Sequence, residues 1–410
     1  MVMMTLVDRA REGRMTGAVK AVARAEQVDP SVLLGRIASG SVVIMRRGRR
    51  SLGIGLGLRT KVNVNIGTSA TKIDPGEEVA KAVIAEQYGA DTLTDLSMGG
   101  DIPSIRRSIL GHTSLPVTTV PIYEAVSRIG LENLEEKDIL RILRDQAKEG
   151  ISSFVVHCPD AGILEGYRRK HRVMGIVSKG GSLTLAYMIR NRCENPFLAR
   201  FDELLRIMRR YDIVLSLGNT MRSGCIHDPR DAAQVREIQR NVELAGRAHR
   251  GGVQVIIEGV GGHVRADRIA SQVTYHKKLG EYPLFVAGPL PTDIAVGHDH
   301  IAGCVGASIA AGAGADYLCY ITPAEHLGLP DPGQVKEGLI AFRIAAHIGD
   351  SMKFGPAARD RRLSERRAEL DWEGQFRHAL DGDGARELAP EEGPCTMCGD
   401  YCAIKMMRDL

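Results

Sequence analysis

The stretch that decides the fold starts with KVNVNIG (residues 61–67), continues through GEEVAKAVIAEQYG (76–89) and reaches TLTDLSMGG (92–100). The first and last pieces are short apolar runs with β-branched residues, which favour strands. The middle piece is an amphipathic stretch of helical length. A strand, a helix and a second strand in this order predict a βαβ unit, and therefore a parallel sheet.

The same alternation continues along the chain. Apolar runs occupy residues 61–67, 92–100, 115–123, 152–159, 173–181, 212–219, 253–263, 283–290 and 315–323. These nine runs predict a (β/α)8 TIM-like barrel of the α/β class, in which one run is an extra strand or an extended loop. The alternative is a doubly wound open sheet. Its glycine-rich fingerprint should follow the first strand, whereas GIGLG (53–57) precedes one and is interpreted as a loop.

Composition limits the partners of this chain of 410 residues. Hydrophobic residues make up 44%, charged residues 25%, and the net charge is only +4, which gives no reason to expect nucleic acid or a membrane as a partner. The basic run MRRGRR (45–50) lacks interleaved aromatic residues and is expected to be solvated surface. No apolar run approaches the ~20 residues that cross a bilayer, and the start has no signal-peptide pattern. We therefore expect a cytoplasmic protein with reduced cysteines.

Four parts are predicted along the chain. Residues 1–60 form a small N-terminal element of helix, turn, helix and short strand, and residues 61–330 form the catalytic barrel. A C-terminal helical segment covers residues 331–390, and a tail covers residues 391–410. The stretch DGDGARELAPEEGP (381–394) has the Gly, Pro and acid content of a linker, which would carry the tail at a distance.

Polar side chains gather where the apolar runs end. In a (β/α)8 barrel, the carboxyl ends of the strands form the face that carries the active site. Each residue alone could instead be a helix cap or a turn residue, but seven of them in different units favour a shared ligand site. They are Asn65, Ser97, Tyr123, His157, Ser178, Asn219 and Glu258.

An anion site is predicted around SKGGS (178–182), interpreted as the end of a strand. Backbone N–H groups, the Ser178 hydroxyl and the Lys179 ammonium suit a phosphate, although a tight turn is an equally good explanation. Arg222, in GNTMRSG (218–224), could supply a second cation to the same anion.

A metal site is predicted from two histidines. His263 follows the run VQVIIEG and His326 follows ADYLCYI, so both should lie on the same face of the barrel, and HDH (298–300) is near in sequence. A single histidine is more often packed or at the surface. Two at successive strand ends, with coordination positions left open, favour a catalytic divalent metal.

The tail holds CTMCGDYC (395–402), with Cys395, Cys398 and Cys402. Iron–sulfur clusters normally take four thiolates, so three would leave one iron of a 4Fe–4S cluster open to a substrate or cosubstrate. A zinc knuckle completed by a distant residue such as His378, or three unliganded thiols, are the alternatives.

The ordered motifs resemble one family, the phosphomethylpyrimidine synthases of thiamine biosynthesis. They are NVNIGTSA, GADTLTDLS, TVPIYEA, IVSKGGS, SLGNTMR, IEGVGGHV, GPLPTDIAVGHDHI, YITPAEHLGLP and CTMCGDYCAIK. The resemblance, from about residue 60 onward, implies a non-standard radical S-adenosylmethionine (SAM) lyase with a (β/α)8 barrel. Such an enzyme rearranges 5-aminoimidazole ribonucleotide into 4-amino-5-hydroxymethyl-2-methylpyrimidine phosphate, releasing formate and carbon monoxide. It also implies a homodimer, in which the tail reaches the partner's site, and an electron donor for the cluster.

The resemblance also assigns residues. His263 and His326 are implied to hold the divalent metal, with zinc expected, and Cys395, Cys398 and Cys402 to hold a 4Fe–4S cluster. Glu258 and the three cysteines are implied to be catalytic. The implied ribonucleotide ligands are Asn65, Thr94, Tyr123, His157, Ser178, Lys179, Gly180, Asn219, Thr220, Met221, Arg222, Glu258 and Phe285.

Several of these positions depart from the family pattern. Lys179 replaces the usual Arg, which keeps the charge but loses a bidentate fork, and Asn219 replaces a carboxylate. Thr94 replaces a Met and Phe285 a Tyr, while the tail has the spacing C-x2-C-x3-C in place of C-x2-C-x4-C. A paralogue that resembles hydroxybenzimidazole synthase, which starts from the same ribonucleotide, is therefore the main alternative. A metal-dependent barrel hydrolase and a non-catalytic ribonucleotide-binding protein are two others.

Overall fold

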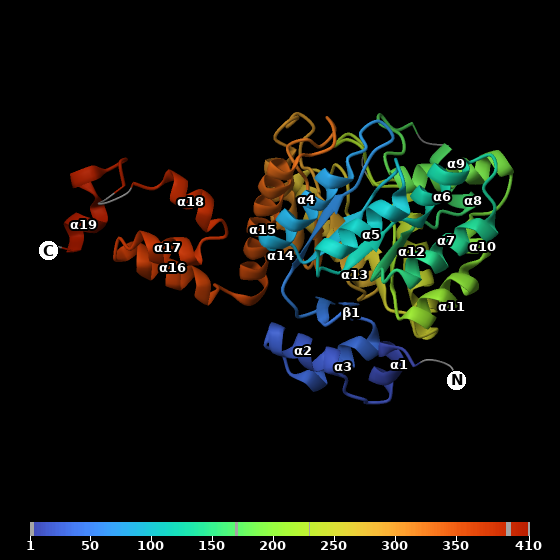
Figure 1. Cartoon of the computed structure of the whole chain (residues 1–410), viewed down its shortest axis with the longest axis horizontal. Helices are drawn as coiled ribbons and strands as arrows, with labels where there is room; N and C mark the ends of the chain where they lie inside the picture. Colours follow the sequence, from blue (N-terminus) through green and yellow to red (C-terminus); the bar gives the residue numbers. More distant parts are fainter. Residues whose placement is uncertain (1–3, 169–170, 229, 391–394, 409–410) are drawn as a thin grey trace. The chain divides into compact units, whose positions relative to one another are not determined.

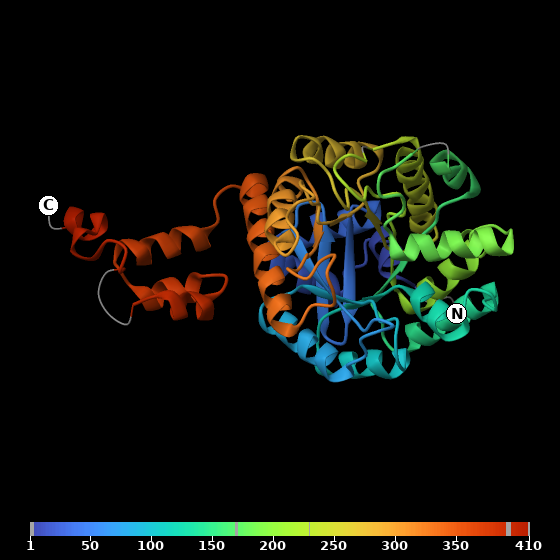
Figure 2. The same ribbon diagram turned by 90° about the horizontal axis from the view of Figure 1, so that it is seen from above.

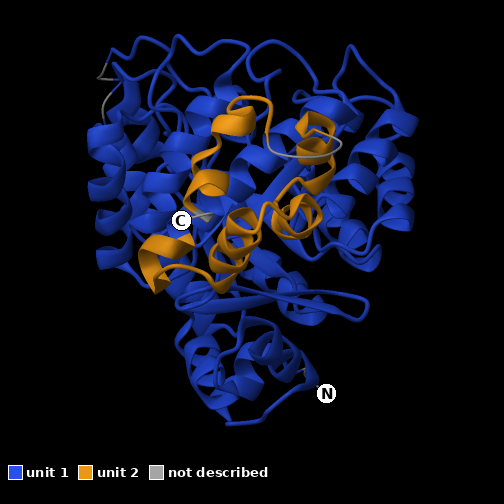
Figure 3. Ribbon diagram, turned by 90° about the vertical axis from the view of Figure 1, so that its left-hand side faces the viewer, with its two compact units in different colours: residues 1–349 blue, residues 350–410 orange. Residues whose placement is uncertain are grey.

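A computed structural model describes residues 4–168, 171–228, 230–390 and 395–408. The chain forms two compact units, residues 1–349 and residues 350–410, which are coloured separately in Figure 3. The first unit contains the N-terminal element and the barrel, and the second contains short helices and the cysteine tail. The four-part division above is a finer one and stays a prediction.

Eight parallel strands close a barrel in the order β10-β3-β4-β5-β6-β7-β8-β9, seen end-on in Figure 2. The strands are β3 (Lys61–Ile66), β4 (Thr92–Asp95), β5 (Val117–Thr119), β6 (Ser153–Val156), β7 (Val214–Leu217), β8 (Val255–Glu258), β9 (Leu284–Ala287) and β10 (Tyr317–Cys319). Closure follows because β10 pairs with both β9 and β3. The predicted (β/α)8 fold is confirmed.

Helices surround the barrel because each strand buries apolar residues on its outer face. Several of these helices begin at an Asp whose side chain accepts a backbone N–H, as Asp74, Asp101 and Asp231 do. The helices of this unit after β3 are α4 (Pro75–Gln87), α5 (Ile102–His112), α6 (Pro121–Ile129), α7 (Glu136–Lys148), α8 (Ala161–Arg168), α9 (Lys179–Asn191), α10 (Pro196–Ala199), α11 (Phe201–Tyr211), α12 (Ala232–Arg250), α13 (Ala266–Leu279), α14 (Asp299–Gly312) and α15 (Pro332–Phe354), which continues past residue 349.

The ninth apolar run, residues 173–181, is not a strand. It is an irregular segment that ends at Ser178, the N-cap of α9. The interpretation of SKGGS as the end of a strand was therefore wrong. Gly175 and the glycine pair after Lys179 explain why: the run has β-branched residues but too many glycines to pair as a central strand.

The N-terminal element consists of α1 (Leu6–Arg11), α2 (Gly17–Glu26), α3 (Pro30–Ser39) and the antiparallel hairpin β1 (Val42–Arg47) and β2 (Arg50–Gly55). Helix α2 was not predicted. GIGLG (53–57) was expected to be a loop, but its first three residues belong to β2. MRRGRR spans the hairpin turn, where Arg47 is half-buried and donates to backbone carbonyls at the end of α5.

The hairpin closes the amino end of the barrel (Figure 1). Val43, Met45 and Ile54 form one buried apolar cluster with barrel residues that include Val214 and Ile256. In addition, the Gln254 side chain accepts from the Ile44 amide at 2.7 Å and donates to the Ile44 carbonyl at 3.2 Å. The hairpin therefore covers the amino end of the barrel, opposite the end that carries the predicted site residues.

The second unit is built from short helices: α16 (Ala358–Ala368), α17 (Trp372–His378), α18 (Gly382–Leu388), the 3-10 turn η1 (Gly399–Tyr401) and α19 (Ala403–Arg408). The segment expected to be a linker contains α18, because Asp381 caps a helical turn at the Gly384 amide. Among the described residues, no helix has the length and apolar content that crossing a membrane requires.

Candidate active site

The strand register brings predicted site residues to the same level at the mouth of the barrel. Asn65 on β3 lies opposite Thr94 on β4, and Glu258 on β8 lies opposite Phe285 on β9. The others lie just beyond strand ends: His157 follows β6, Tyr123 is in the first turn of α6, and the loop 218–222 follows β7. The carboxyl end of the barrel thus collects polar residues that are distant in sequence.

The N-terminus of α9 is built as an anion site. Ser178 Oγ accepts the Gly181 amide at 3.1 Å and also lies 3.1 Å from His157 Nε2. A Cβ on Gly180 would come within 2.4 Å of the His157 ring, so only glycine allows this approach. The helix N-terminus carries N–H groups and a partial positive charge, which favour a phosphate or carboxylate.

His157 is held as a neutral imidazole. Burial, and to a lesser extent the charge of Arg222, lower the pKa of His157 to about 3. Among the described residues, its buried Nδ1 atom has no hydrogen-bond partner. A buried polar atom without a partner is costly unless a ligand or water satisfies it, which makes this nitrogen a candidate contact for a bound molecule.

Two cations adjoin this helix end. The Lys179 ammonium lies 5.4 Å from the centre of the Tyr123 ring, and desolvation lowers the pKa of Lys179 although Glu325 opposes the shift. Arg222 donates to the carbonyls of Asn219 at 3.2 Å and Val177 at 3.3 Å, which ties the loop after β7 to the segment before α9.

Glu258, the last residue of β8, carries a half-buried carboxyl. Ser216 Oγ donates to its Oε1 atom at 3.0 Å. Burial raises the pKa of Glu258. The rise is opposed by the Ser216 hydroxyl, the charge of Arg222 and the backbone N–H of Asn219. A carboxyl with a raised pKa is suited to proton transfer.

Thr220 and Met221 are both buried, Thr220 against the first turn of α9 and Met221 in an apolar cluster. The Met221 side chain is fully buried in an apolar cluster with Ile163, Leu185 and Met188. The methyl group of Thr220 limits the space at Gly181. The backbone amides of both residues donate to Glu237, at 2.8 and 2.7 Å, so the backbone of this loop is held from behind.

The interior beneath the mouth is polar and partly sulfur-lined. Asn65 Nδ2 lies 3.0 Å from Cys319 Sγ, and Thr94 Oγ1 donates to Asn63 at 2.9 Å. Burial raises the pKa of Cys319 to about 12, so this thiol stays protonated. Phe285 stacks on Tyr317 with 4.1 Å between the ring centres. Asn63 and Cys319 were not predicted to belong to the site, since a polar residue inside a strand carries no signal of which way it points.

The two predicted metal ligands meet at the mouth. His263 Nε2 and His326 Nε2 are 3.5 Å apart, close to the ~3.3 Å expected for two imidazoles on one tetrahedral ion with bonds of ~2.0 Å. His263 Nδ1 lies 2.6 Å from Asp293, and His326 Nδ1 lies 3.2 Å from Asp299. Carboxylates behind the distal nitrogens are typical of metal-binding histidines. The residues present therefore fit a divalent metal.

Within the described part of the chain, the other histidines and acids near the pair do not complete a metal site with it. His300, in the HDH segment, contacts Glu337 at 3.0 Å and does not join the pair; only Asp299 of that segment does. Across the described ranges, no three His, Cys, Asp or Glu side chains are gathered to hold a metal by themselves. The histidine pair thus leaves most coordination positions to other ligands.

In the second unit, the three tail cysteines flank the turn η1. Cys402 is buried, Cys395 is half-buried and Cys398 is exposed. Desolvation and the neighbouring Cys395 and Cys402 thiols raise the pKa of Cys398. The assignment of the three cysteines to one cluster stays a prediction.

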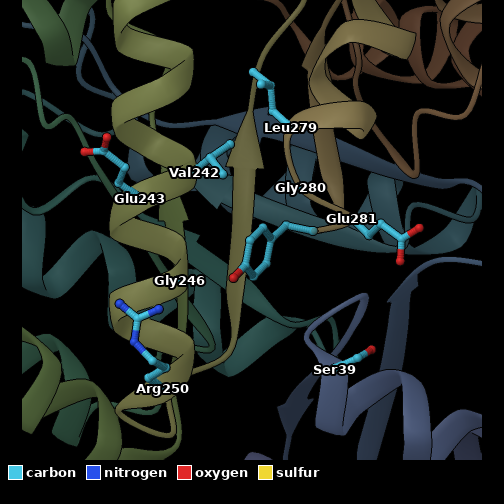
Figure 4. Close-up of a pocket in the computed structure, with 9 residues that line it drawn as sticks. Ser39, Val242, Glu243, Gly246, Arg250, Leu279, Gly280 and Glu281 are labelled. Atoms are coloured by element: carbon cyan, nitrogen blue, oxygen red, sulfur yellow. The ribbon is translucent and has the colours of Figure 1, made fainter.

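Two cavities differ in their relation to the site. One of about 1000 Å³ is lined by His263 together with Ser223, Arg230, Arg265 and Gln272, among others. The other, of about 570 Å³, lies between α12, the residues before β9 and the end of α3 (Figure 4). Since Arg250 and Tyr282 precede strands, the second cavity is at the amino end of the barrel, away from the predicted site.

Paired imidazoles open to further ligands are typical of barrel enzymes with a catalytic metal, and a tail with three thiols is typical of a redox cluster. The particular family follows from comparison with known proteins. Residues 5–409 match the Radical SAM ThiC family, and the chain belongs to it. Phosphomethylpyrimidine synthase of Thermus thermophilus is 45% identical over 424 residues, covering 98% of this chain and 97% of the relative. The Archaeoglobus fulgidus protein of the same name is 42% identical and is covered to 99%, as is this chain.

Family membership confirms the predicted class. The chain is an enzyme of the radical SAM type, in the family responsible for the pyrimidine of thiamine, and this family implies an iron–sulfur cluster and SAM. A small-molecule substrate and a reductant are consistent with such an enzyme. The individual ligands, the barrel metal and the assembly stay predictions.

Proposed function

We propose that the protein converts 5-aminoimidazole ribonucleotide into 4-amino-5-hydroxymethyl-2-methylpyrimidine phosphate, acting as a carbon–carbon lyase. The observation that carries the proposal is the mouth of the barrel, where an anion site at the start of α9 lies on the same face as a paired-imidazole site. A ribonucleotide needs the first for its phosphate, and SAM can use a metal at the second for its amino-acid group.

The phosphate is assigned to Ser178, Lys179, Gly180 and Arg222. Helix N–H groups, one hydroxyl and two cations supply the donors that a phosphate dianion needs, and Arg222 reaches both segments that border the site. Lysine in place of the usual arginine keeps the charge but gives a less directional contact.

The imidazole end is assigned to residues that face the interior at the strand ends. His157 offers an unpartnered nitrogen, and Glu258 offers a carboxyl whose raised pKa suits proton transfer. The Asn219 side chain can accept and donate hydrogen bonds where the family has a carboxylate. It can therefore bind polar groups, but it cannot accept a proton as a carboxylate does. The full set is Asn65, Thr94, Tyr123, His157, Asn219, Glu258 and Phe285, with Thr220 and Met221 shaping the loop.

His263 and His326 are proposed to hold one divalent metal, with zinc the expected ion. Asp293 and Asp299 would fix the tautomer of each ring, so that both Nε2 atoms keep free lone pairs. The cavity of about 1000 Å³ beside His263 has room for SAM, and its arginines suit a carboxylate.

Cys395, Cys398 and Cys402 are proposed to hold a 4Fe–4S cluster, which, when reduced by an external electron donor, cleaves SAM and supplies the radical. The three residues between Cys398 and Cys402 form the turn η1, so the shorter spacing corresponds to one compact turn. Open thiolate coordination requires a reducing environment, which supports a cytoplasmic location.

A homodimer is proposed to form through α14 and α15. These helices pack closely, because a Cβ on Gly349 would come within 2.2 Å of the Ala311 side chain. Ile301 and Val305 on α14, and Ile344 and Ile348 on α15, are each at least 40% exposed. Paired apolar residues four positions apart on two adjacent helices form the kind of surface that homodimers bury.

The test is an anaerobic reaction of the reconstituted protein with reductant, SAM and the ribonucleotide, with products identified by mass spectrometry. A pyrimidine phosphate together with 5′-deoxyadenosine is the expected result. Hydroxybenzimidazole would support the paralogue, which the altered residues Thr94, Lys179, Asn219 and Phe285 favour. Intact SAM in the presence of a verified cluster would exclude both reactions.

A further inference from the structure

Two side chains of α12 hold the backbone of the loop after β7. Glu237 is buried, with 1% of its surface exposed, and its two carboxylate oxygens accept the amides of Thr220 at 2.8 Å and Met221 at 2.7 Å. One helical turn further on, Asn241 Nδ2 donates to the Gly218 carbonyl at 3.1 Å. Three backbone groups of residues 218–221 are thus bound by one face of a rigid helix.

These hydrogen bonds fix the direction in which the backbone of the loop turns. With Met221 packed inward and its amide taken by Glu237, the backbone turns so that Asn219 and Arg222 are left for the mouth of the barrel. The backbone N–H of Asn219 contacts Glu258, and Arg222 donates to the Val177 carbonyl at 3.3 Å. A tilt of this loop would therefore displace the proposed phosphate cation and the contact to the Glu258 carboxyl together.

We infer that Glu237 is a positioning residue for the ribonucleotide: it orients the loop that carries Asn219 and Arg222 without touching the ligand itself. The inference rests on the proposed function. It adds a residue of α12, outside every motif that carries the family resemblance, to the group that determines substrate affinity.

A carboxylate is needed here because both partners are donors. A glutamine has nearly the same shape but only one acceptor oxygen, and its NH2 group would face a second N–H donor. Glu237→Gln therefore breaks one hydrogen bond and leaves a buried amide unsatisfied, while the volume of the side chain stays the same.

The experiment compares four full-length, cluster-reconstituted proteins: wild type, Glu237→Gln, Gln234→Met and Arg222→Ala. Gln234→Met is the matched control, because Gln234 is also buried on α12 but its Oε1 atom has no partner among the described residues. Ribonucleotide affinity is measured by anaerobic calorimetry, KM and kcat by product formation, and amide exchange of residues 218–222 by mass spectrometry.

The expected result for Glu237→Gln is binding weaker by about 10-fold or more, with KM rising more than kcat falls and with faster exchange in the loop. Gln234→Met should leave all three unchanged. Glu237→Asp, which keeps two acceptors, should recover part of the affinity, and it serves for the binding test if Glu237→Gln does not fold. Unchanged binding in Glu237→Gln, when Arg222→Ala does weaken it, overturns the positioning role alone. Unchanged binding in both overturns the proposed phosphate site as well.

Discussion

The Nε2 atoms of His263 and His326 lie 3.5 Å apart, although the two histidines are 63 positions apart in the chain. Each ring also meets a carboxylate at Nδ1, from Asp293 or Asp299. Two bare imidazole lone pairs facing each other at this distance repel, unless a proton or a metal ion lies between them. The geometry is consistent with the proposed shared metal ion.

Removing both imidazoles should remove one divalent metal and leave the cluster in place. We expect His263→Ala combined with His326→Ala to lose one metal ion per chain in elemental analysis, with iron and sulfide from the tail unchanged. Asp293→Asn should weaken metal affinity by ~10–100-fold, since it loses the carboxylate that orients His263. His298→Ala, an exposed histidine of the same region, is the control. Equal metal content in the double variant and the wild type would contradict the site.

Cys398→Ala should abolish the cluster without unfolding the barrel. Loss of one thiolate leaves too few ligands for a stable 4Fe–4S centre. Iron and sulfide content and the visible absorbance after anaerobic reconstitution should fall to background, with far-UV circular dichroism unchanged. Cys193→Ala, which removes an exposed cysteine outside the tail, should have no effect. Stoichiometric zinc without sulfide in the wild type would favour the zinc knuckle.

Arg222→Ala should weaken ribonucleotide binding by ~1–3 kcal/mol, the scale of a lost hydrogen bond to a charged group. Arg236→Ala, which removes an exposed arginine from α12, is the matched control and should bind normally. Calorimetry with inorganic phosphate as competitor shows whether the lost energy belongs to the phosphate end. Equal affinities for the two variants would argue against the anion site at α9.

The barrel should lose stability on mild acidification. Burial, then Arg230 and Lys277, lower the pKa of His276 to about 3, whereas an unfolded histidine titrates near its ordinary ~6.5. Below pH 6.5 the unfolded state therefore binds a proton at His276 that the folded state does not bind. As a result, the free energy of unfolding falls as pH falls through that range. From pH 7.5 to 5.5, His276 alone accounts for a loss of about 1.4 kcal/mol.

His276→Gln should reduce this pH dependence by that amount in urea unfolding. The measurement should use far-UV circular dichroism, because the single tryptophan, Trp372, lies in the second unit and its fluorescence does not report on the barrel. An identical pH dependence in variant and wild type would show that the pKa of His276 is the same in the folded and unfolded states.

A charge on the apolar face of α14 and α15 should dissociate the dimer. Ile348 is 43% exposed, so Ile348→Glu is expected to leave the folded chain intact while the buried charge opposes association. Sedimentation velocity should show a monomer. Val32→Glu, at a residue of similar exposure on α3, should remain dimeric. A dimer that survives Ile348→Glu places the interface elsewhere.

The barrel could be predicted from the sequence because a buried strand appears as a short run rich in apolar residues, as in KVNVNIG and VQVIIEG. The error at residues 173–181 has a physical reason: a segment with three β-branched residues, Val173, Ile176 and Val177, resembles a strand whether or not its backbone is paired. The candidate ligands could be placed on one face for the same reason, since strand ends share a side of the sheet. Asp293, Asp299 and Glu237 could not be found this way. Their roles depend on which side chain they meet across the fold, and a lone acid after a loop or within a helix is usually a cap or a surface charge.

Among the described residues, the hairpin packed under the strands covers the amino end of the barrel with Val43, Met45 and Ile54. A ribonucleotide bound at the proposed site would then enter, and its product leave, past the rim that carries His263 and His326. A cosubstrate bound at that rim would lie across the path to Asn65 and Thr94. Binding and release are then sequential events through one passage, and the order of addition becomes a property of the architecture as much as of the chemistry.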